Sequence, residues 1–195
     1  MHNAYDVIIV GAGVIGANIA RELSKYQLSV LLIEKDGDVC ARVSMANSAI
    51  VHSGYDPVPG TKKAYFNVKG NAMFDELCRN LDVEFYRIGS LTIAMDEGQM
   101  NTLKDLAKRA KENHVKVELL NHDALLKIEP NINPSAAGAL LAPTAGIVDP
   151  FTFCSHNMEN ALDNGVKLNL NEEVKSIKDL KSYSSSFQKP LILSP

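Results

Sequence analysis

Residues 5–35 read YDVIIVGAGVIGANIARELSKYQLSVLLIEK, and this stretch decides the fold. Its first part, Tyr5–Val10, is rich in β-branched residues and is typical of a strand buried on both faces. Apolar residues then recur at helical spacing up to about Lys25, and Ser29–Glu34 reads as a second buried strand. A helix that joins two parallel strands makes a β-α-β unit, so the sequence predicts an α/β fold with a sheet covered on both faces.

Gly11, Gly13 and Gly16 stand between the first strand and the helix, in the spacing G-x-G-x-x-G. The first glycine permits a tight turn, the second lets the backbone approach a pyrophosphate, and the third lets the helix pack closely on the strand. The N–H groups and the dipole at the helix start then attract the phosphates. Glu34 follows Gly16 by 18 residues, close to the roughly 20 expected for the acid that binds ribose hydroxyls. The sequence therefore predicts a dinucleotide site.

Glu34 also narrows the choice of dinucleotide, because a carboxylate repels a 2′-phosphate and so disfavours NADP. The glycine pattern by itself leaves NAD and FAD open. The residues predicted to contact the dinucleotide in this stretch are Gly11, Ala12, Gly13, Val14, Ile15, Gly16, Glu34 and Lys35.

The composition of the 195 residues is that of an ordinary globular protein, which excludes collagen, a coiled coil and disorder throughout. Lysine and arginine number 20 against 23 aspartates and glutamates, so the net charge of −3 argues against nucleic acid as a partner. No apolar run approaches the roughly 20 residues that span a bilayer. The N-terminus carries no basic region ahead of an apolar stretch, so we expect no secretory signal and a cytoplasmic location.

The three cysteines, Cys40, Cys78 and Cys154, are odd in number, widely separated and without a C-x-x-C pair. This spacing argues against both a disulfide framework and a zinc site. We therefore expect three free thiols, buried or half-buried, and no metal.

The rest of the chain predicts a second module inserted into the first. Periodicity fails from Gly37 to Gly60, and long irregular connections in compact domains are often functional. Helices are expected from about Lys62 to Asn80 and from Pro150 to about Asn164, the second capped by Asp149, and a strand at Val166–Leu170 would rejoin the first sheet. The predicted organisation is the N-terminal part of the dinucleotide-binding domain (1–81), an inserted α+β substrate-type module (82–148), a return to the first domain (149–178) and a disordered or aberrant tail (179–195).

Two stretches carry a family resemblance. Tyr5–Lys35 resembles the FAD fingerprint of the flavoprotein oxidoreductases related to D-amino-acid oxidase and glycerol-3-phosphate dehydrogenase. The segment NSAIVHSGY at 47–55, followed by PGTKKA at 59–64 and VKG at 68–70, is similar to the L-2-hydroxyglutarate oxidase branch of that superfamily. The resemblance covers about residues 5–178.

This resemblance implies an incomplete Rossmann-like FAD-binding domain with an inserted α+β module. It implies FAD as the cofactor, with its isoalloxazine ring near Ser44–Gly54. It also implies oxidation of a small anionic hydroxy compound, such as L-2-hydroxyglutarate or glycerol 3-phosphate, by hydride transfer to flavin. Ser44, Asn47 and Ser48 offer short hydroxyl and amide groups to the cofactor, and Gly54 permits close backbone approach, although ordinary turn chemistry explains the three polar residues as well.

His52 is the candidate catalytic residue. An imidazole accepts a hydroxyl proton near neutral pH, and in the resembling family a histidine in this H-S/A-G context lies by the flavin. The alternative is a histidine that only packs or hydrogen-bonds locally. Arg87, Lys62 and Lys63 are weaker candidates to meet an anionic substrate, because isolated cations are usually solvated.

The main alternative to an active oxidoreductase is a truncated, catalytically inactive dinucleotide-binding fragment. Members of the resembling family are considerably longer, and a serine-rich tail follows Ile177 where a further strand would be expected. An incomplete sheet would leave a strand edge exposed, so we expect self-association. The electron acceptor is left undetermined, as is contact with a membrane surface or a partner subunit.

Overall fold

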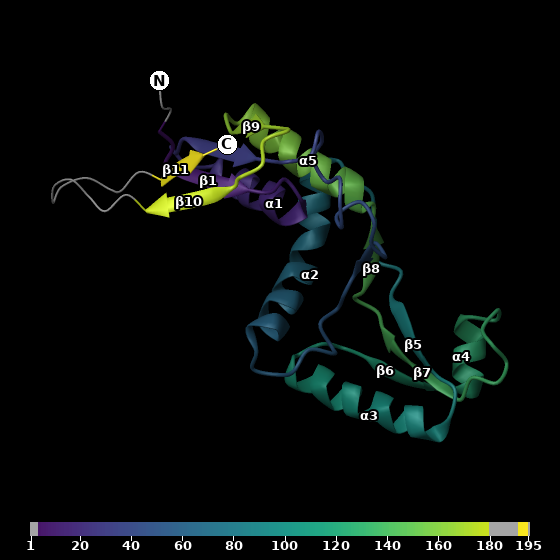
Figure 1. Ribbon diagram of the computed structural model, residues 1–195. Helices are drawn as coiled ribbons and strands as arrows, with labels where there is room; N and C mark the ends of the chain where they lie inside the picture. The colour runs from purple at the N-terminus through teal and green to yellow at the C-terminus, as the bar shows by residue number, and fades with distance from the viewer. Residues whose placement is uncertain (1–3, 180–190, 195) are drawn as a thin grey trace. The chain divides into compact units, whose positions relative to one another are not determined.

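The computed structural model describes residues 4–179 and 191–194, and it divides into two compact units (Figure 1). Among the described residues, the first unit takes those up to Ser48, residues 81–83 and those from Asp149 onward. The second unit takes residues 49–80 and 84–148. The start of the second unit differs from the boundary expected at 82, because Ile50 pairs with Ile147 in an antiparallel ladder and ties this earlier segment to the module.

The first unit is built on a parallel sheet of three strands in the order β1-β2-β9. Strand β1 (Val7–Val10) pairs with β2 (Val30–Ile33), and β2 pairs in turn with β9 (Lys167–Asn169). Helix α1 (Val14–Leu23) connects the first two strands, and α5 (Pro150–Asp163) leads into β9. The predicted β-α-β unit and the rejoining strand are both confirmed.

Local chemistry explains these elements. All four residues of β2 are buried, as expected for the central strand of a covered sheet. The core beneath it joins Ile9 and Leu32 to Ala17 and Ala20 of α1 and to Met158 of α5. Small residues on α1 let the helices approach one another closely.

Helix α5 has the predicted beginning. The Asp149 side chain accepts a hydrogen bond from the N–H of Phe151 at 3.0 Å, and Pro150 occupies the first helical position. Hydrogen bonds from Thr152 and the helix backbone hold the pKa of Asp149 below its ordinary value.

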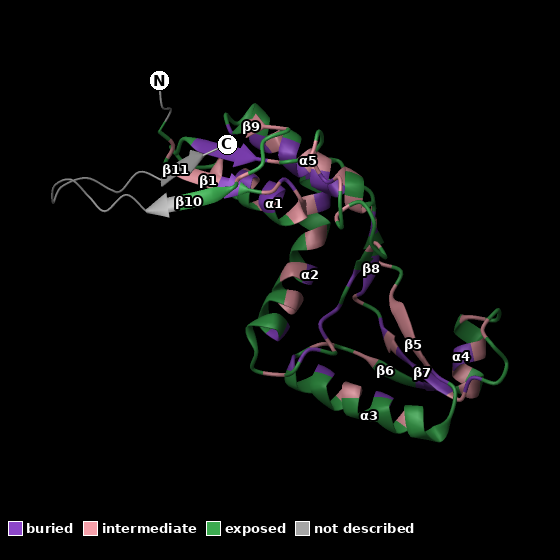
Figure 2. Cartoon of the chain, viewed as in Figure 1, coloured by how far each residue is buried: buried purple, intermediate pink, exposed green. Residues whose placement is uncertain are grey.

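The second unit contains two antiparallel sheets. One has the order β3-β8-β4 and the other the order β5-β7-β6. Their strands are β3 (Ile50–Val51), β4 (Phe85–Tyr86), β5 (Ser90–Ala94), β6 (Glu118–Asn121), β7 (Gly138–Ala142) and β8 (Gly146–Val148). Its helices are α2 (Lys62–Leu81), α3 (Glu97–Glu112) and α4 (His122–Ile128). Figure 2 shows buried residues along β7, the central strand of its sheet, and exposed ones on the outer side of α3.

The end of the chain contains a strand pair. Strand β10 (Ser176–Asp179) pairs antiparallel with β11 (Leu191–Ser194). The expectation of an irregular tail is therefore wrong at 191–194, where three successive aliphatic residues supply the strand. For residues 180–190 and 195 the prediction lies outside the described residues.

The cysteines correct a second prediction. Cys40 and Cys154 are joined by a disulfide, with their Cα atoms 6.2 Å apart, although 114 residues separate them in sequence. The expectation of free thiols is wrong for these two because helix α5 returns to the segment that follows β2, and sequence spacing carries no sign of this. Cys78 is free and buried, as predicted.

Cys78 leads to a prediction about its reactivity. Burial, with a smaller contribution from the charge of Asp75, raises the pKa of the Cys78 thiol to about 11. We expect iodoacetamide at pH 8 to alkylate Cys78 about 100-fold more slowly in the native protein than in the denatured chain, because the thiolate is the reactive form. Mass spectrometry of timed samples measures both rates, and equal rates would contradict the assigned burial.

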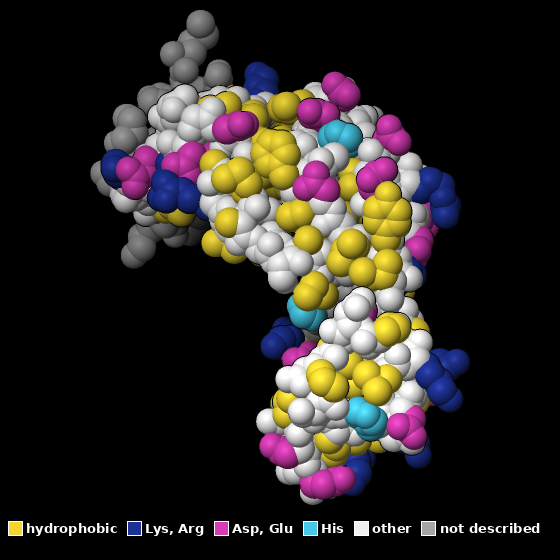
Figure 3. Space-filling model, turned by 90° about the vertical axis from the view of Figure 1, so that its right-hand side faces the viewer, with side chains coloured by type: hydrophobic (Ala, Val, Ile, Leu, Met, Phe, Trp, Pro, Cys, Tyr) yellow, Lys and Arg dark blue, Asp and Glu magenta, His cyan; other side chains and the backbone are white. Residues whose placement is uncertain are grey.

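The surface carries charges of both signs. On the face drawn in Figure 3, Lys and Arg side chains are interspersed with Asp and Glu. Within the described residues, no helix has the length and apolar character needed to cross a membrane.

Candidate functional site

The three glycines of the loop between β1 and α1 each have a geometric reason. Gly11 has φ +102°, a conformation that favours glycine, and its N–H donates to the carbonyl of Ile33 at 2.8 Å. A Cβ on Gly16 would lie 2.0 Å from the carbonyl oxygen of Gly11, so α1 packs against the loop only because this position has no side chain. A Cβ on Gly13 would lie 3.1 Å from Ser44 Oγ. The predicted glycine roles are those of a dinucleotide-binding loop.

The start of α1 is open to an anion. The helix begins at Val14, and Gly13 in front of it supplies no side-chain cap. Backbone N–H groups in the first turn of a helix lack intrahelical partners and carry partial positive charge. Ser44 Oγ accepts one of them, the N–H of Val14, at 2.9 Å, and the side chain of Ile15 beside it is exposed.

Glu34 is fixed at the end of β2. One carboxylate oxygen accepts from the N–H of Ala12 at 2.7 Å, and the other accepts from the N–H of Asp36 at 2.9 Å. An ionised carboxylate has about four acceptor positions, so Glu34 retains capacity for hydroxyl donors. The same bond to Ala12 couples Glu34 to the middle of the glycine loop. Lys35, next in sequence, is exposed.

The segment after β2 contributes unequally. Ser44 reaches the start of α1, as described above. The Asn47 side-chain amide donates to the carbonyls of Val43 and Ser44, both at 3.1 Å. These local hydrogen bonds are the ordinary turn chemistry that was the alternative to contact with the cofactor. Ser48 is exposed. Of the three polar residues predicted here, the structure brings Ser44 to the glycine loop.

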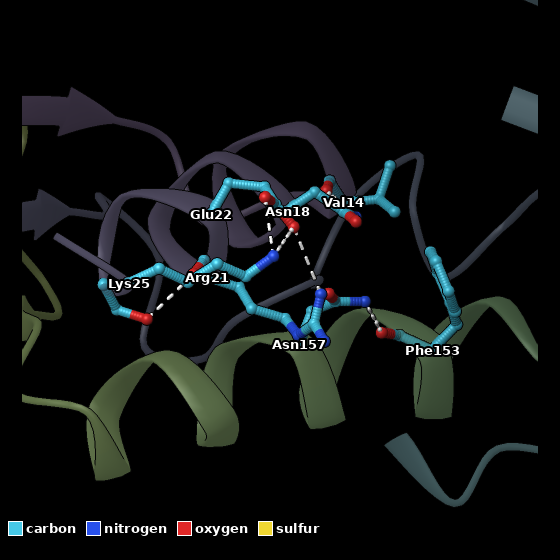
Figure 4. A network of polar contacts seen from close by, with 8 residues as sticks. Val14, Asn18, Arg21, Glu22, Lys25, Phe153 and Asn157 are labelled. Atoms are coloured by element: carbon cyan, nitrogen blue, oxygen red, sulfur yellow. Dashed lines mark hydrogen bonds and ion pairs between the residues drawn. The ribbon is translucent and has the colours of Figure 1, made fainter. Parts of the chain in front are cut away.

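Helices α1 and α5 pack against each other in the core next to the glycine loop. Figure 4 shows Arg21 and Asn18 of α1 beside Asn157 of α5. Asn157 is fully buried, and its amide donates to the carbonyl of Phe153 at 2.7 Å. Arg21 donates to Glu22 at 3.3 Å on the same helix. The interface between α1 and α5 thus includes polar side chains that are only partly satisfied, because Arg21 Nε and Asn157 Oδ1 are buried without a hydrogen-bond partner among the described residues.

His52 and Gly54 belong to the second unit. The His52 side chain is exposed, and its backbone carbonyl accepts from the Asn71 amide at 3.1 Å. Gly54 has φ +93°, and a Cβ there would lie 2.7 Å from Val68. Packing against α2 therefore explains this glycine, while its contact with a cofactor stays a prediction.

A network of hydrogen bonds joins the backbone of His52 to Asn71 and Arg87, and the sequence did not indicate it. The buried Asn71 also donates to the carbonyl of Thr144 at 2.9 Å. Arg87 donates to the Asn71 side chain at 3.0 Å and to the Asp75 carboxylate at 2.8 Å, and this pairing holds the pKa of Asp75 below its ordinary value. Arg87 is thus engaged inside its own unit instead of standing as an isolated cation for a substrate. Asn71 and Arg87 are 16 residues apart, so no local sequence pattern predicts their contact.

Within the described residues, no group of three or more His, Cys, Asp or Glu side chains is arranged to hold a metal ion.

Comparison with known proteins gives consistent matches. The family model described as "FAD dependent oxidoreductase" (DAO) matches residues 6–185. A glycerol 3-phosphate dehydrogenase from Caloramator mitchellensis is 51% identical over 174 residues, covering 89% of this chain and 36% of that protein. An L-2-hydroxyglutarate dehydrogenase from Escherichia coli K12 is 30% identical over 146 residues, covering 74% of this chain and 34% of that protein.

A solved structure is also similar. The L-alpha-glycerophosphate oxidase from Mycoplasma pneumoniae, determined with FAD bound, has a TM-score of 0.87 and 31% identity. The match covers 92% of this chain and 48% of that one. The chain thus spans less than half the length of the relatives it matches.

Proposed function

We propose, from the premise that this chain belongs to the DAO family of FAD-dependent oxidoreductases, that its first unit binds FAD. The observation that carries the proposal is the geometry of the glycine loop. Gly16 packs against Gly11 at a distance that leaves no room for a Cβ, and the Glu34 carboxylate accepts a hydrogen bond from the N–H of Ala12. The expected cofactor residues remain Gly11–Gly16, Glu34, Lys35, Ser44, Asn47, Ser48 and Gly54.

The residues fit FAD in charge and in shape. The first turn of α1 suits the pyrophosphate, Gly13 has no side chain to keep a ligand away from the backbone, and the spare acceptor positions of Glu34 suit ribose hydroxyls. Bound FAD supplies a two-electron oxidant, a chemistry that protein side chains lack.

We propose glycerol 3-phosphate as the substrate of the whole protein. The relative named for this substrate is 51% identical, against 30% for an L-2-hydroxyglutarate dehydrogenase. His52 would take the proton from the hydroxyl of the carbon that is oxidised. The imidazole is exposed, and the backbone carbonyl of His52 is held by Asn71, which in turn is held by Arg87.

Spectroscopy tests this function in two steps. FAD is titrated into the purified chain, and saturable quenching of flavin fluorescence is expected. Anaerobic addition of glycerol 3-phosphate should then bleach the flavin absorbance, with L-2-hydroxyglutarate as the competing candidate. FAD binding without bleaching by either compound would favour the catalytically inactive alternative, and absence of FAD binding would contradict the first step.

The edge of the first sheet bears on whether the chain self-associates. Strand β1 is an outer strand among the described strands of this sheet, and Val10 at its end is 56% exposed. An unpaired strand edge templates pairing with a second chain. We therefore propose that the isolated chain self-associates, with an apparent mass in light scattering that rises with protein concentration. A monodisperse monomer at all concentrations would contradict this.

A further inference from the structure

The Cys40–Cys154 bond lies against the glycine loop. The N–H of Cys40 donates to the carbonyl oxygen of Ala12 at 3.0 Å, and Cys154 Sγ lies 3.9 Å from that same oxygen. Cys154 belongs to α5, and Cys40 to the irregular segment after β2. Both side chains are buried, at 2% and 0% exposure. The bond therefore joins two chain segments at the central residue of the loop.

The segment that carries Cys40 also has non-covalent anchors, and most of these are polar contacts. Ser44, four residues later, holds the start of α1 through the N–H of Val14. Arg42 donates two hydrogen bonds to the Asp36 carboxylate, both at 2.7 Å. The Arg42 side chain is nevertheless 68% exposed and Val43 is 79% exposed, so residues 42–43 are held by contacts at the surface and not by burial.

The backbone of Cys40 adds a second observation. Its φ of +61° lies in the left-handed region, which residues other than glycine and asparagine adopt rarely. Such a conformation persists where the surroundings fix it. Here they do so through the bond to Cys154 and the hydrogen bond to Ala12.

We propose that Cys40 and Cys154 form a reversible thiol–disulfide modification site that controls the order of the glycine loop and of residues 37–48. When the bond is intact, Ser44 and Ala12 are held ready for the ligand. When it is reduced, the segment loses its covalent anchor and the loop must be ordered on binding, which weakens affinity. The link to FAD affinity rests on the proposed function, whereas the link to loop order does not.

The chemistry is balanced by a small-molecule disulfide. Because both cysteines are buried, exchange takes place while residues 37–48 are transiently open. One cysteine thiolate then attacks a sulfur of that disulfide, which forms a mixed disulfide and releases one thiolate. The second cysteine thiolate attacks the protein sulfur of the mixed disulfide, which closes the Cys40–Cys154 bond and releases a second thiolate. The two cysteines lose two electrons and two protons, and the small disulfide gains them as two thiols. A dithiol reverses both steps.

The test uses a Cys78→Ser background, so that the pair supplies all thiols. The protein is equilibrated with glutathione disulfide or with dithiothreitol, and thiols are counted by alkylation in denaturant and mass spectrometry. The expected result is none in the first state and two in the second. The reduced form should bind FAD about 10-fold more weakly, within the range typical of coupled sites, and FAD should favour the disulfide by the same factor.

Two variants and a second measurement make the outcome decisive. Cys40→Ser and Cys154→Ala, each in the Cys78→Ser background, should bind FAD like the reduced form. The one cysteine left in each variant can form only a mixed disulfide with glutathione, which mass spectrometry identifies by its added mass, and cannot close the intramolecular bond. Amide hydrogen exchange at residues 11–16 and 37–48 should be faster in the reduced form even without FAD. If no disulfide forms, or if exchange is the same in both states, the inference is overturned. If exchange differs and neither state binds FAD, the proposed function fails and the control of loop order stands.

Discussion

Replacing His52 by alanine is expected to slow the anaerobic bleaching of bound flavin by glycerol 3-phosphate about 10²–10⁴-fold, the usual contribution of a positioned general base. The affinity for FAD should stay within about twofold. The His52 side chain is exposed, and the hydrogen bond from Asn71 goes to the backbone carbonyl, so alanine at this position should change the stability of the fold little.

A matched control is His114→Asn. His114 is an exposed histidine of the same unit, and its φ of +58° suits asparagine. This variant should bleach at the wild-type rate. Equal rates for His52→Ala and wild type, with flavin bound in both, would remove His52 from the reaction and leave the local packing role as its explanation.

Replacing Gly16 by alanine is expected to destroy the loop. The added Cβ would lie 2.0 Å from the carbonyl oxygen of Gly11, and that atom is backbone, so no side-chain rotation relieves the clash. Helix α1 would have to move away from β1 and from its contacts with α5. We expect a loss in the free energy of unfolding of about 3 kcal/mol or more, with FAD binding abolished. Thermal unfolding and FAD titration measure the two effects.

Gly70→Ala is the control for this substitution. Gly70 lies in the middle of α2, and a Cβ there would meet no heavy atom within 4 Å. Alanine should therefore stabilise the helix by up to about 1 kcal/mol and leave FAD binding unchanged. If Gly16→Ala is as stable as wild type and still binds FAD, the close packing of α1 on the loop is not what the glycine provides.

Local patterns were enough to predict the first β-α-β unit. The apolar run before Gly11, the glycine spacing and the acid at position 34 are each read within a few residues, and each has the expected place in the fold. The expectation that this run is buried on both faces is wrong, because β1 is an outer strand among the described strands and only Ile9 in it is buried. The cap of α5 was predictable for the same reason, because Asp149 and Pro150 are neighbours.

Contacts between distant residues were not predictable in this way. The hydrogen bond from Val14 to Ser44 joins residues 30 apart, and the disulfide joins residues 114 apart. Periodicity describes which face of an element is buried but does not say what lies opposite. For this reason the sequence indicated Ser44 only by residue type, and it predicted free thiols where Cys40 and Cys154 are bonded.

The discontinuity of the first unit has a consequence for biosynthesis. Its opening segment ends at Ser48 and its sheet is completed by β9 at Lys167–Asn169, whereas the second unit is finished at Val148. A ribosome therefore releases every residue of the second unit before α5 and β9 emerge, and domains tend to fold as units during synthesis. We expect the second unit to fold while β1 and β2 still lack β9, the third strand of their sheet. The nascent β1–α1–β2 segment is then the part of this chain most dependent on protection by chaperones.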